Sequence, residues 1–215
     1  MKWPPENRLQ KMIRTQLQRR GIGDRAVLHA MAAVPRHMFV PESIRAHAYE
    51  DRALPLIEGQ TISQPFMVAL MAQSLQLHGH ERVLDVGTGS GYAAAVLSLL
   101  SAEVYSVERS EALAHEASGR LHALGYDNVK VIVGDGTQGM PEFAPFQGIS
   151  VAASSPWVPL PLRQQLADGG RLVIPVGGRE EQLLLRITRI DDTTRIEQLG
   201  GVRFVPLIGD HAWNN

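Results

Sequence analysis

The sequence of residues 82–92 is Arg82-Val83-Leu84-Asp85-Val86-Gly87-Thr88-Gly89-Ser90-Gly91-Tyr92. A short apolar run leads into three glycines at alternate positions, and an alanine- and leucine-rich stretch, residues 93–100, follows. This order predicts a strand, a tight turn and a helix. Glycine accepts positive φ and leaves no Cβ between the backbone and a ligand, so the turn predicts a pocket lined by backbone N–H groups.

The spacing of these glycines distinguishes between cofactors. In the dinucleotide fingerprint G-x-G-x-x-G, the last glycine comes three residues after the second and lets the helix pack close to the pyrophosphate. Here Gly91 follows Gly89 by two residues, and the bulky Tyr92 stands where the fingerprint has its last glycine. The turn therefore disfavours NAD and FAD and favours an adenosine cofactor without a pyrophosphate.

Acidic residues follow the next two expected strands. Glu108 comes after the run Glu103–Val107, about 20 residues beyond the first glycine, where a carboxylate can bind a ribose diol. The run Val129–Val133 leads to Gly134-Asp135-Gly136, where a carboxylate can lie near an adenine amino group. Together with the turn, these strand ends predict S-adenosylmethionine, with S-adenosylhomocysteine as product and no metal. The competing interpretation is an ordinary tight turn with solvated acidic residues.

Length and composition limit the class of protein. The 215 residues carry a net charge of −1 and no cysteine, which excludes disulfides and thiol catalysis and provides no positive field for nucleic acid or a membrane surface. We expect one domain over residues 1–215, with a helical and substrate-loop extension over residues 1–77 and an α/β core with a C-terminal hairpin over residues 78–215. We expect a cytoplasmic protein, because no signal peptide or membrane span is evident. We also expect a monomer.

Two amphipathic helices are expected near the N-terminus. The first ends at Gly21, and its buried face is expected to be Leu9, Met12, Ile13, Gln16 and Leu17. Asp24 is expected to cap the second, which ends before Pro35 and whose apolar face is Val27, Ala30, Met31 and Val34. Residues 36–41 are expected to be extended.

The pattern of residues 54–68 indicates a loop that is folded over another group. Polar residues 60, 61, 63 and 64 lie among apolar ones, with Gly59 and Pro65 as breaks in the pattern. The alternative is a surface loop in which Ser63 or Gln64 caps the following helix, residues 65–77.

After residue 82, expected strands and helices alternate, which predicts an α/β fold with a mostly parallel, doubly wound sheet. Ser110 is expected to cap a helix that runs to Leu124. The tail is expected to form an antiparallel hairpin around Asp191-Asp192-Thr193. The remaining expected elements are a strand over residues 149–152, a loop over 154–159, a helix over 161–167, a strand over 171–176 and hairpin strands over 182–190 and 195–205.

Across nearly its whole length the sequence resembles the protein-L-isoaspartate(D-aspartate) O-methyltransferase family. The glycine turn is common to many methyltransferases, whereas the stretches Gly59–Pro65 and Arg203–Leu207 are more specific to this family. The matching segments are Arg20-Gly21-Ile22, Val34-Pro35-Arg36, Ala48-Tyr49-Glu50-Asp51, Leu54-Pro55, Gly59-Gln60-Thr61-Ile62-Ser63-Gln64-Pro65, residues 83–92, Gly134-Asp135-Gly136, Ala144-Pro145-Phe146, Gln165-Leu166, Gly169-Gly170-Arg171-Leu172, Pro175-Val176-Gly177 and Val202-Arg203-Phe204-Val205-Pro206-Leu207.

The resemblance implies a Rossmann-like, S-adenosylmethionine-dependent methyltransferase that esterifies the free carboxylate of L-isoaspartyl residues in damaged proteins or peptides. The ester then collapses to a succinimide, so that part of the damage reverts to aspartate. By resemblance, Ser63 is the catalytic residue beside methyl donor and substrate carboxylate. The expected cofactor-binding residues are Gly87, Thr88, Gly89, Ser90, Glu108, Asp135 and Gly136, and the expected substrate-binding residues are Gln60, Thr61, Ile62, Ser63, Val205 and Pro206.

The expected chemistry needs no general base, because a carboxylate is already ionised at neutral pH. Ser63 would orient the carboxylate without taking a proton. The sequence departs from the family's usual pattern at a few positions that we expect to lie near the cleft: Ile57, Thr137, Met140, Gln147 and the loop over residues 152–157.

Other functions are consistent with the same motifs. A relative that methylates another carboxylate, such as one in a peptide natural product, is suggested by Gln147 and the altered loop. A non-catalytic adenosine-binding module would need the same turn, and a dehydrogenase is disfavoured by Tyr92. His78-Gly79-His80 could suggest a metal pair, but the sequence offers no obvious third ligand and a solvated turn is preferred.

Overall fold

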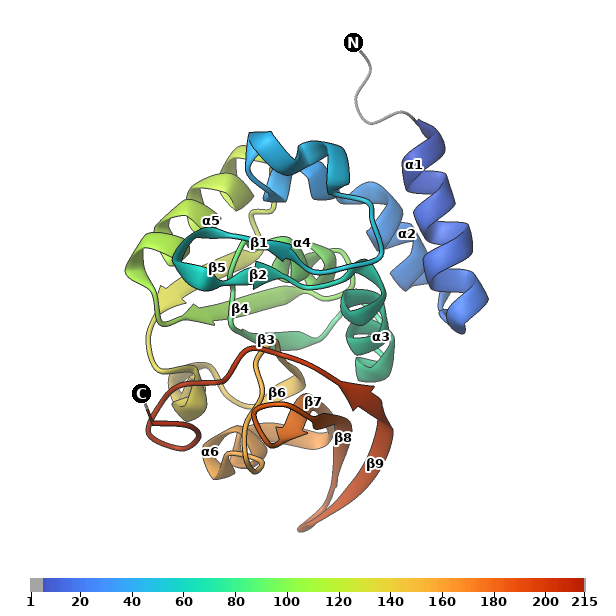
Figure 1. Cartoon of the computed structure of the whole chain (residues 1–215). Coiled ribbons are helices and arrows are strands. Elements are labelled where there is room, and N and C mark those ends of the chain that lie inside the picture. The colour runs from blue at the N-terminus through green and yellow to red at the C-terminus, as the bar shows by residue number, and fades with distance from the viewer. Residues whose placement is uncertain (1–5, 215) are drawn as a thin grey trace.

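The computed structural model describes residues 6–214, and a seven-stranded sheet forms its centre (Figure 1). The strand order is β5-β4-β3-β6-β7-β8-β9. Strands β5, β4, β3, β6 and β7 pair in parallel, and β8 and β9 are antiparallel. This confirms the predicted mostly parallel sheet with a C-terminal hairpin. The strands are β3 (Arg82–Val86), β4 (Glu103–Glu108), β5 (Val129–Val133), β6 (Phe146–Val151), β7 (Leu166–Gly177), β8 (Gln182–Ile190) and β9 (Thr193–Val202).

Helices cover both faces of this sheet, as predicted for a doubly wound fold. Val83 packs into a core shared with α2 (Arg25–Ala33), α3 (Pro65–Leu75) and α4 (Tyr92–Ser98). The next residue, Leu84, faces a second core that includes α6 (Leu160–Gln164). Adjacent strand residues point to opposite faces, so burial of both faces explains why the parallel strands read as continuous apolar runs. Helix α5 (Glu111–Ala123) adds Leu121 to the first core.

The order of the strands places a switch point beside β3. From β3 the chain continues to β4 and β5 on one side of the sheet and then to β6 and β7 on the other. Ligands of open α/β sheets bind outside the carboxyl ends of strands at such a point. The segments that follow β3, β4 and β6 are therefore well placed to form a site.

The first helical segment confirms the predicted helix that ends at Gly21, but only its first part is a regular α-helix. It consists of α1 (Glu6–Lys11), the π-helical η1 (Met12–Leu17) and the 3₁₀ turn η2 (Gln18–Arg20), and it ends at Gly21 with φ of 94°. Met12 and Leu17 are both fully buried although they lie five residues apart. The i→i+5 turn of a π-helix brings such residues onto one face.

The second helix, α2, confirms the prediction. The side chain of Asp24 accepts hydrogen bonds from Ala26 N at 2.8 Å and Val27 N at 3.2 Å. The prediction that residues 36–41 are extended is wrong, because Arg36–Phe39 form the 3₁₀ helix η3. A second 3₁₀ helix, η4 (Glu42–His47), follows. Within η3, Phe39 is fully buried and packs edge-on against Tyr92 at 5.6 Å, so the tight turn serves to bring this side chain into the core.

Residues 54–62 form a small hairpin rather than an irregular loop. Strand β1 (Leu54–Pro55) pairs with β2 (Thr61–Ile62), and η5 (Ile57–Gly59) connects them. Helix α3 begins at Pro65 as predicted and ends at Leu75, two residues before the predicted end, because Gln76 takes a left-handed conformation with φ of 53°.

Beyond β5 the chain forms two 3₁₀ turns, η6 (Gly136–Gln138) and η7 (Pro141–Phe143), before β6. The predicted helix over residues 161–167 is shorter, because Leu166 pairs with Phe146 and already belongs to β7. The hairpin β8–β9 is confirmed, although β9 ends at Val202. After it, Val205 O accepts a hydrogen bond from Ser154 N at 2.7 Å, which leads the chain back over the carboxyl edge of the sheet. Within residues 6–214, no helix has both the length and the apolar character needed to cross a membrane.

Candidate active site

A cavity of about 240 Å³ lies at the carboxyl edge of the sheet. Its walls come from the β1–β2 hairpin, the glycine turn after β3, the end of β4, the turn after β5, the loop after β6 and the segment after β9. Every predicted site residue except Asp135 lines it. The predicted residues in its walls are Gln60, Thr61, Ile62, Ser63, Gly87, Thr88, Gly89, Ser90, Glu108, Gly136, Val205 and Pro206.

The glycine turn has the conformation that its sequence predicted. Gly87, Gly89 and Gly91 have φ angles of 91°, 51° and 86°, which side-chain-bearing residues rarely adopt. Gly87 N donates to Val107 O at 2.9 Å, so the turn is bonded to β4. A Cβ on Gly91 would lie 3.2 Å from Leu121, so this glycine also lets α5 pack closely against the turn.

Glu108 lies where the sequence predicted an acidic group. Its side chain is in the cavity wall and its exposed fraction is 7%. Its Oε2 accepts a hydrogen bond from Gly89 N at 2.9 Å and its Oε1 accepts one from Ser110 N at 3.0 Å. Each carboxylate oxygen has a second lone pair, so the same group can also accept hydrogen bonds from ligand hydroxyls.

Asp135 accepts hydrogen bonds from groups of the protein itself. Its Oδ1 accepts hydrogen bonds from Thr137 N at 2.8 Å and Thr137 Oγ1 at 2.7 Å, and its Oδ2 accepts one from Asp210 N at 2.9 Å. Burial alone would raise the pKa of Asp135, but these donors lower it below the ordinary value. Gly209 lies against this carboxylate, which leaves no room for a Cβ there. The side chain thus fixes the C-terminal segment beside the cavity, while Gly136 lines the cavity itself.

A second acidic residue, Asp85, lies beneath the turn. It is fully buried in β3, and burial raises its pKa to about 7, although a hydrogen bond from Ser106 lowers it and the charge of Glu108 adds to the rise. Ser106 Oγ donates to Asp85 Oδ2 at 2.7 Å and lies 2.6 Å from Thr88 Oγ1. A chain of hydroxyl groups therefore connects a buried titratable acid to the cavity wall. Sequence reasoning treated Asp85 only as part of the strand.

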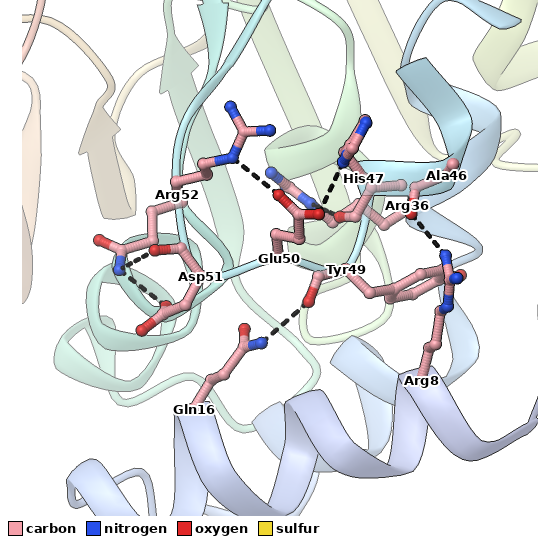
Figure 2. A network of polar contacts seen from close by, with 11 residues as sticks. Arg8, Gln16, Arg36, Ala46, His47, Tyr49, Glu50, Asp51 and Arg52 are labelled. Carbon is pink, nitrogen blue, oxygen red and sulfur yellow. Dashed lines mark hydrogen bonds and ion pairs between the residues drawn. The ribbon is translucent and has the colours of Figure 1, made fainter. Parts of the chain in front are cut away.

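The hairpin wall is supported mainly at its base. Figure 2 shows polar side chains of the N-terminal helical segment reaching the backbone just before the hairpin. Gln16 Nε2 donates to Tyr49 O at 2.9 Å, and Arg8 Nη1 donates to Ala46 O at 2.6 Å. The N-terminal extension thus positions the strand that precedes one wall of the cavity.

Gln64 closes the base of the hairpin from the other side. Its Nε2 donates to Asp51 O at 3.0 Å and to Asp51 Oδ1 at 2.7 Å. The alternative in which Gln64 caps α3 is wrong, because this N-cap residue makes no side-chain capping bond. Ser63 is half-buried and lines the cavity.

Sequence reasoning did not identify most of the apolar lining. Val107 and Leu207 are ordinary strand or loop residues in the sequence, and nothing marks them as site residues. For Tyr92, only its position in the glycine turn indicated a place near the site. The centre of its ring lies 4.8 Å from the guanidinium of the buried Arg36. The lining residues that were not predicted include Val68, Val86, Tyr92, Ala93, Val107, Arg109, Ala152, Ala153, Leu207 and Ile208.

A wider groove of about 1410 Å³ opens beside the cavity. It runs between α3 and the β8–β9 hairpin, and five residues line both spaces: Thr61, Ser63, Ala152, Val205 and Pro206. The hydroxyl-bearing Ser63 therefore stands where a confined cavity meets an open groove.

The expectation that the departures from the family pattern cluster near the cleft is wrong for Gln147. Its Oε1 accepts a hydrogen bond from Arg82 N at 2.8 Å. Arg82 begins β3, so Gln147 lies at the amino edge of the sheet, opposite the cavity. Thr137 and Met140 are buried and do not line the cavity, whereas Ala152 does.

The His78-Gly79-His80 turn is held by a carboxylate. The backbone N–H groups of all three residues donate to the Glu81 side chain at 2.8, 2.8 and 3.0 Å. In the part of the chain that the structure describes, no group of three or more His, Cys, Asp or Glu side chains could hold a metal ion.

Comparison with known proteins gives a consistent result. Residues 7–212 match the family model described as Protein-L-isoaspartate(D-aspartate) O-methyltransferase (PCMT). The Protein-L-isoaspartate O-methyltransferase of Roseiflexus castenholzii is 64% identical over 92% of this chain and 90% of its own length. The Protein-L-isoaspartate O-methyltransferase 1 of Syntrophobacter fumaroxidans is 52% identical over 94% of this chain and 95% of its own length.

Solved structures show the same similarity. A protein-L-isoaspartate O-methyltransferase superposes with a TM-score of 0.86 at 30% identity, over 95% of this chain and 67% of its own. A putative protein-L-isoaspartate O-methyltransferase from Plasmodium falciparum, in complex with S-adenosyl-L-homocysteine, has a TM-score of 0.78 at 29% identity, over 94% of this chain and 97% of its own.

Proposed function

The chain belongs to the protein-L-isoaspartate(D-aspartate) O-methyltransferase family, and we propose that it transfers the methyl group of S-adenosylmethionine to the free carboxylate of L-isoaspartyl residues in damaged proteins or peptides. The observation that carries the proposal is the meeting of two spaces at Ser63. A confined cavity suits a small cofactor, and an open groove suits a polypeptide. A group that lines both can contact donor and acceptor together.

The residues of the confined cavity fit S-adenosylmethionine. The glycine turn offers a backbone surface without side chains, and Glu108 offers a carboxylate to the ribose hydroxyls. Gly136 lines the cavity without a side chain, and a Cβ there would lie 2.5 Å from Val86, so glycine lets this turn pack closely on β3 and offer its backbone to the adenine. When bound, the cofactor supplies a methyl group on a positively charged sulfur. In this proposal Gly87, Thr88, Gly89 and Ser90 hold its methionine part.

The residues around the acceptor position orient it and exclude water. A substrate carboxylate needs no base, and the cavity wall contains no histidine. We assign to the Ser63 hydroxyl the donation of one hydrogen bond to the carboxylate oxygen that is not methylated. Thr61, Val205 and Pro206 would flank the acceptor, because they line both spaces, and Gln60 and Ile62 would do so from the cavity wall beside Ser63. Holding the reacting atoms in line accounts for most of the expected rate enhancement.

The sequence-based expectation for the active form is a monomer. Gel filtration of the active protein tests this. A cytoplasmic location is the expectation from the sequence, and cell fractionation tests it.

Paired peptides test the function. The protein is incubated with S-adenosylmethionine and either an isoaspartyl peptide or its aspartyl twin, and methyl incorporation is measured. We expect methylation of the isoaspartyl peptide alone. Equal methylation of both peptides, or of neither, contradicts the proposal. Binding of S-adenosylhomocysteine without turnover on any carboxylate would instead indicate an adenosine-binding module.

Two variants separate the proposed roles. Ser63→Ala should lower kcat roughly tenfold to hundredfold with little change in the Kd of S-adenosylhomocysteine, because it removes a hydrogen bond to a charged group. Glu108→Gln should weaken cofactor binding measured by calorimetry. Ser101→Ala is the control. The Ser101 hydroxyl donates to Leu97 O at 2.8 Å, and Ser101 lines neither the cavity nor the groove. Equal loss in Ser63→Ala and Ser101→Ala would contradict the role of Ser63.

A further inference from the structure

The groove that meets the cavity at Ser63 has apolar walls. Helix α3 contributes one wall, and the end of β9 with the following residues contributes the other. These side chains are half-buried, so each packs against the core on one side and faces the groove on the other. The apolar wall residues are Phe66, Met67, Leu70, Leu199, Val202 and Phe204.

Of the four charged residues that line the groove, Arg20 and Arg203 form ion pairs, and the other two, Arg179 and Glu181, are of opposite charge. Arg20 Nη1 lies 2.9 Å from Asp51 Oδ2, and its guanidinium stacks 3.6 Å from the ring of Phe66. Arg203 Nη2 lies 2.8 Å from Glu180 Oε2. These pairs are solvent-exposed, so their charges are compensated and screened. The pairs therefore provide little basis for selecting a charged ligand, whereas the apolar walls favour an apolar one.

The floor of the groove is open because two glycines, which lack side chains, line it. Gly200 and Gly201 line it, and a Cβ at either position would have no atom within 4 Å. Two glycines in succession on the edge strand β9 thus leave space where side chains would otherwise project. Gly200 has φ of 136° and would be strained by a side chain, whereas Gly201 has no such restriction.

The groove is continuous with the candidate active site, which determines its occupant. Any acceptor residue that reaches Ser63 from solvent is part of a chain, and the groove is the wide space that adjoins Ser63. We propose that the groove is a specificity site that binds an apolar side chain of the substrate polypeptide, a few residues from the methyl-accepting residue. This inference rests on the proposed function and adds a preference for damaged sites with an apolar neighbour in sequence.

Binding of paired peptides tests the proposal. Fluorescently labelled isoaspartyl peptides are compared that differ only in leucine or serine at one flanking position, varied in turn on each side. Fluorescence anisotropy in the presence of S-adenosylhomocysteine gives Kd, and initial rates with S-adenosylmethionine give kcat and KM. We expect leucine to lower Kd and KM about tenfold at one or more flanking positions, with kcat unchanged. Equal Kd values for leucine and serine at all positions overturn the proposal.

Matched variants locate the preference in the groove. Leu199→Gln should abolish it, whereas Ile196→Gln, on the same strand but outside the groove and 58% exposed, should preserve it. Gly201→Val adds bulk to the open floor without removing a core contact, and it should raise the Kd of the leucine peptide about tenfold. Retention of the full preference in both Leu199→Gln and Gly201→Val overturns the assignment to this groove.

The two readouts separate failure of this inference from failure of the proposed function. Methylation of isoaspartyl peptides without any leucine preference overturns the inference and leaves the function intact. A leucine preference in binding, lost in Leu199→Gln but without methyl transfer, supports the groove and contradicts the function.

Discussion

The glycine turn and the β1–β2 hairpin face the same cavity, but they are held in different ways. The turn is bonded to β4 through Gly87 N and Val107 O at 2.9 Å, and to α5 through Arg120 Nη1 and Ser90 O at 2.7 Å. The hairpin has strands of two residues each, and its connecting turn carries Ile57 with an exposed fraction of 41%. Its polar anchors lie at the base, where Gln64 binds Asp51.

This difference assigns a fixed geometry to the wall that would hold the cofactor and a more adaptable one to the wall that would hold the acceptor. Segments with few buried contacts open with low free energy, whereas segments bonded on several sides open only with the global fold. The turn that would hold the cofactor is therefore fixed in advance. The hairpin that would hold the acceptor is anchored by the buried Leu54 and Ile62, but its connecting turn is exposed. We expect this turn to adjust to polypeptides of different sequence, which suits an enzyme that acts on damage wherever it occurs.

The largest expected effect concerns Asp85, beneath the rigid turn. Its pKa is about 7 in the folded protein against an ordinary value of 3.8, so between these pH values the folded state keeps a proton that the unfolded state has lost. The stability contributed by the neutral acid is complete below about pH 4 and is lost as pH rises towards 7. Asp85→Asn cannot titrate and therefore removes this pH-dependent loss of unfolding free energy, which amounts to roughly 4 kcal/mol at most.

Urea unfolding at several pH values between 4 and 8 measures this effect. The wild-type free energy of unfolding should fall relative to that of Asp85→Asn as pH rises, whatever the offset between the two at low pH. Parallel pH profiles for the two proteins would show that Asp85 does not titrate in this range.

A pair of alanine substitutions compares the two walls directly. Gly91→Ala should destabilise the protein by about 3 kcal/mol, because it combines left-handed strain with a Cβ 3.2 Å from Leu121. Gly59→Ala in the hairpin has the same strain, with φ of 68°, but no atom within 4 Å, and should cost about 1 kcal/mol. Chemical denaturation measures both values. Equal costs would mean that the turn is no more tightly packed than the hairpin.

The base of the hairpin can be loosened selectively. Gln64→Ala removes two hydrogen bonds to Asp51 and should cost about 1 kcal/mol. Hydrogen exchange should accelerate in residues 54–62 and stay unchanged in the glycine turn. The exposed Gln198→Ala on β9 is the control. Faster exchange in both walls would show that they open together.

The smallest effect is expected at the tip of the hairpin. Glu58 has a left-handed φ of 54°, so Glu58→Gly relieves strain but increases the entropy of the unfolded chain. The net result should be a stabilisation of about 0.5 kcal/mol, measured by thermal unfolding. Glu42→Gly, which relieves no such strain, should destabilise the protein instead. A loss of stability in Glu58→Gly would indicate that the Glu58 side chain supports the hairpin.

The sequence predicts the parallel core well because its signals are local. The apolar runs of β3, β4 and β5 and the glycines after β3 specify strand and turn without reference to distant residues. The strand ends then bring Glu108 and the glycine turn together, since parallel strands share one carboxyl edge. The capping of α2 by Asp24 and of α5 by Ser110 is local in the same sense.

The features that the sequence did not predict depend on contacts between distant residues. Asp135 accepts a hydrogen bond from Asp210, which is 75 residues away, and Gln147 accepts one from Arg82, which is 65 residues away. No local pattern reveals either partner. The π-helical turn over residues 12–17 is likewise set by packing, because Met12 and Leu17 must both reach the core. Apolar lining residues such as Leu207 carry no signal that separates them from ordinary core residues.

The position of the segment that follows β9, near the end of the sequence, affects when the cavity can form during synthesis. Residues 205–208 complete the cavity, and Val205 O and Leu207 N bond to Ser154 N and O at 2.7 Å each. A nascent polypeptide that has assembled every parallel strand still lacks this wall. Catalytic competence should therefore arise only after residue 208 has left the ribosomal exit tunnel, so a partly synthesised enzyme would not consume its methyl donor.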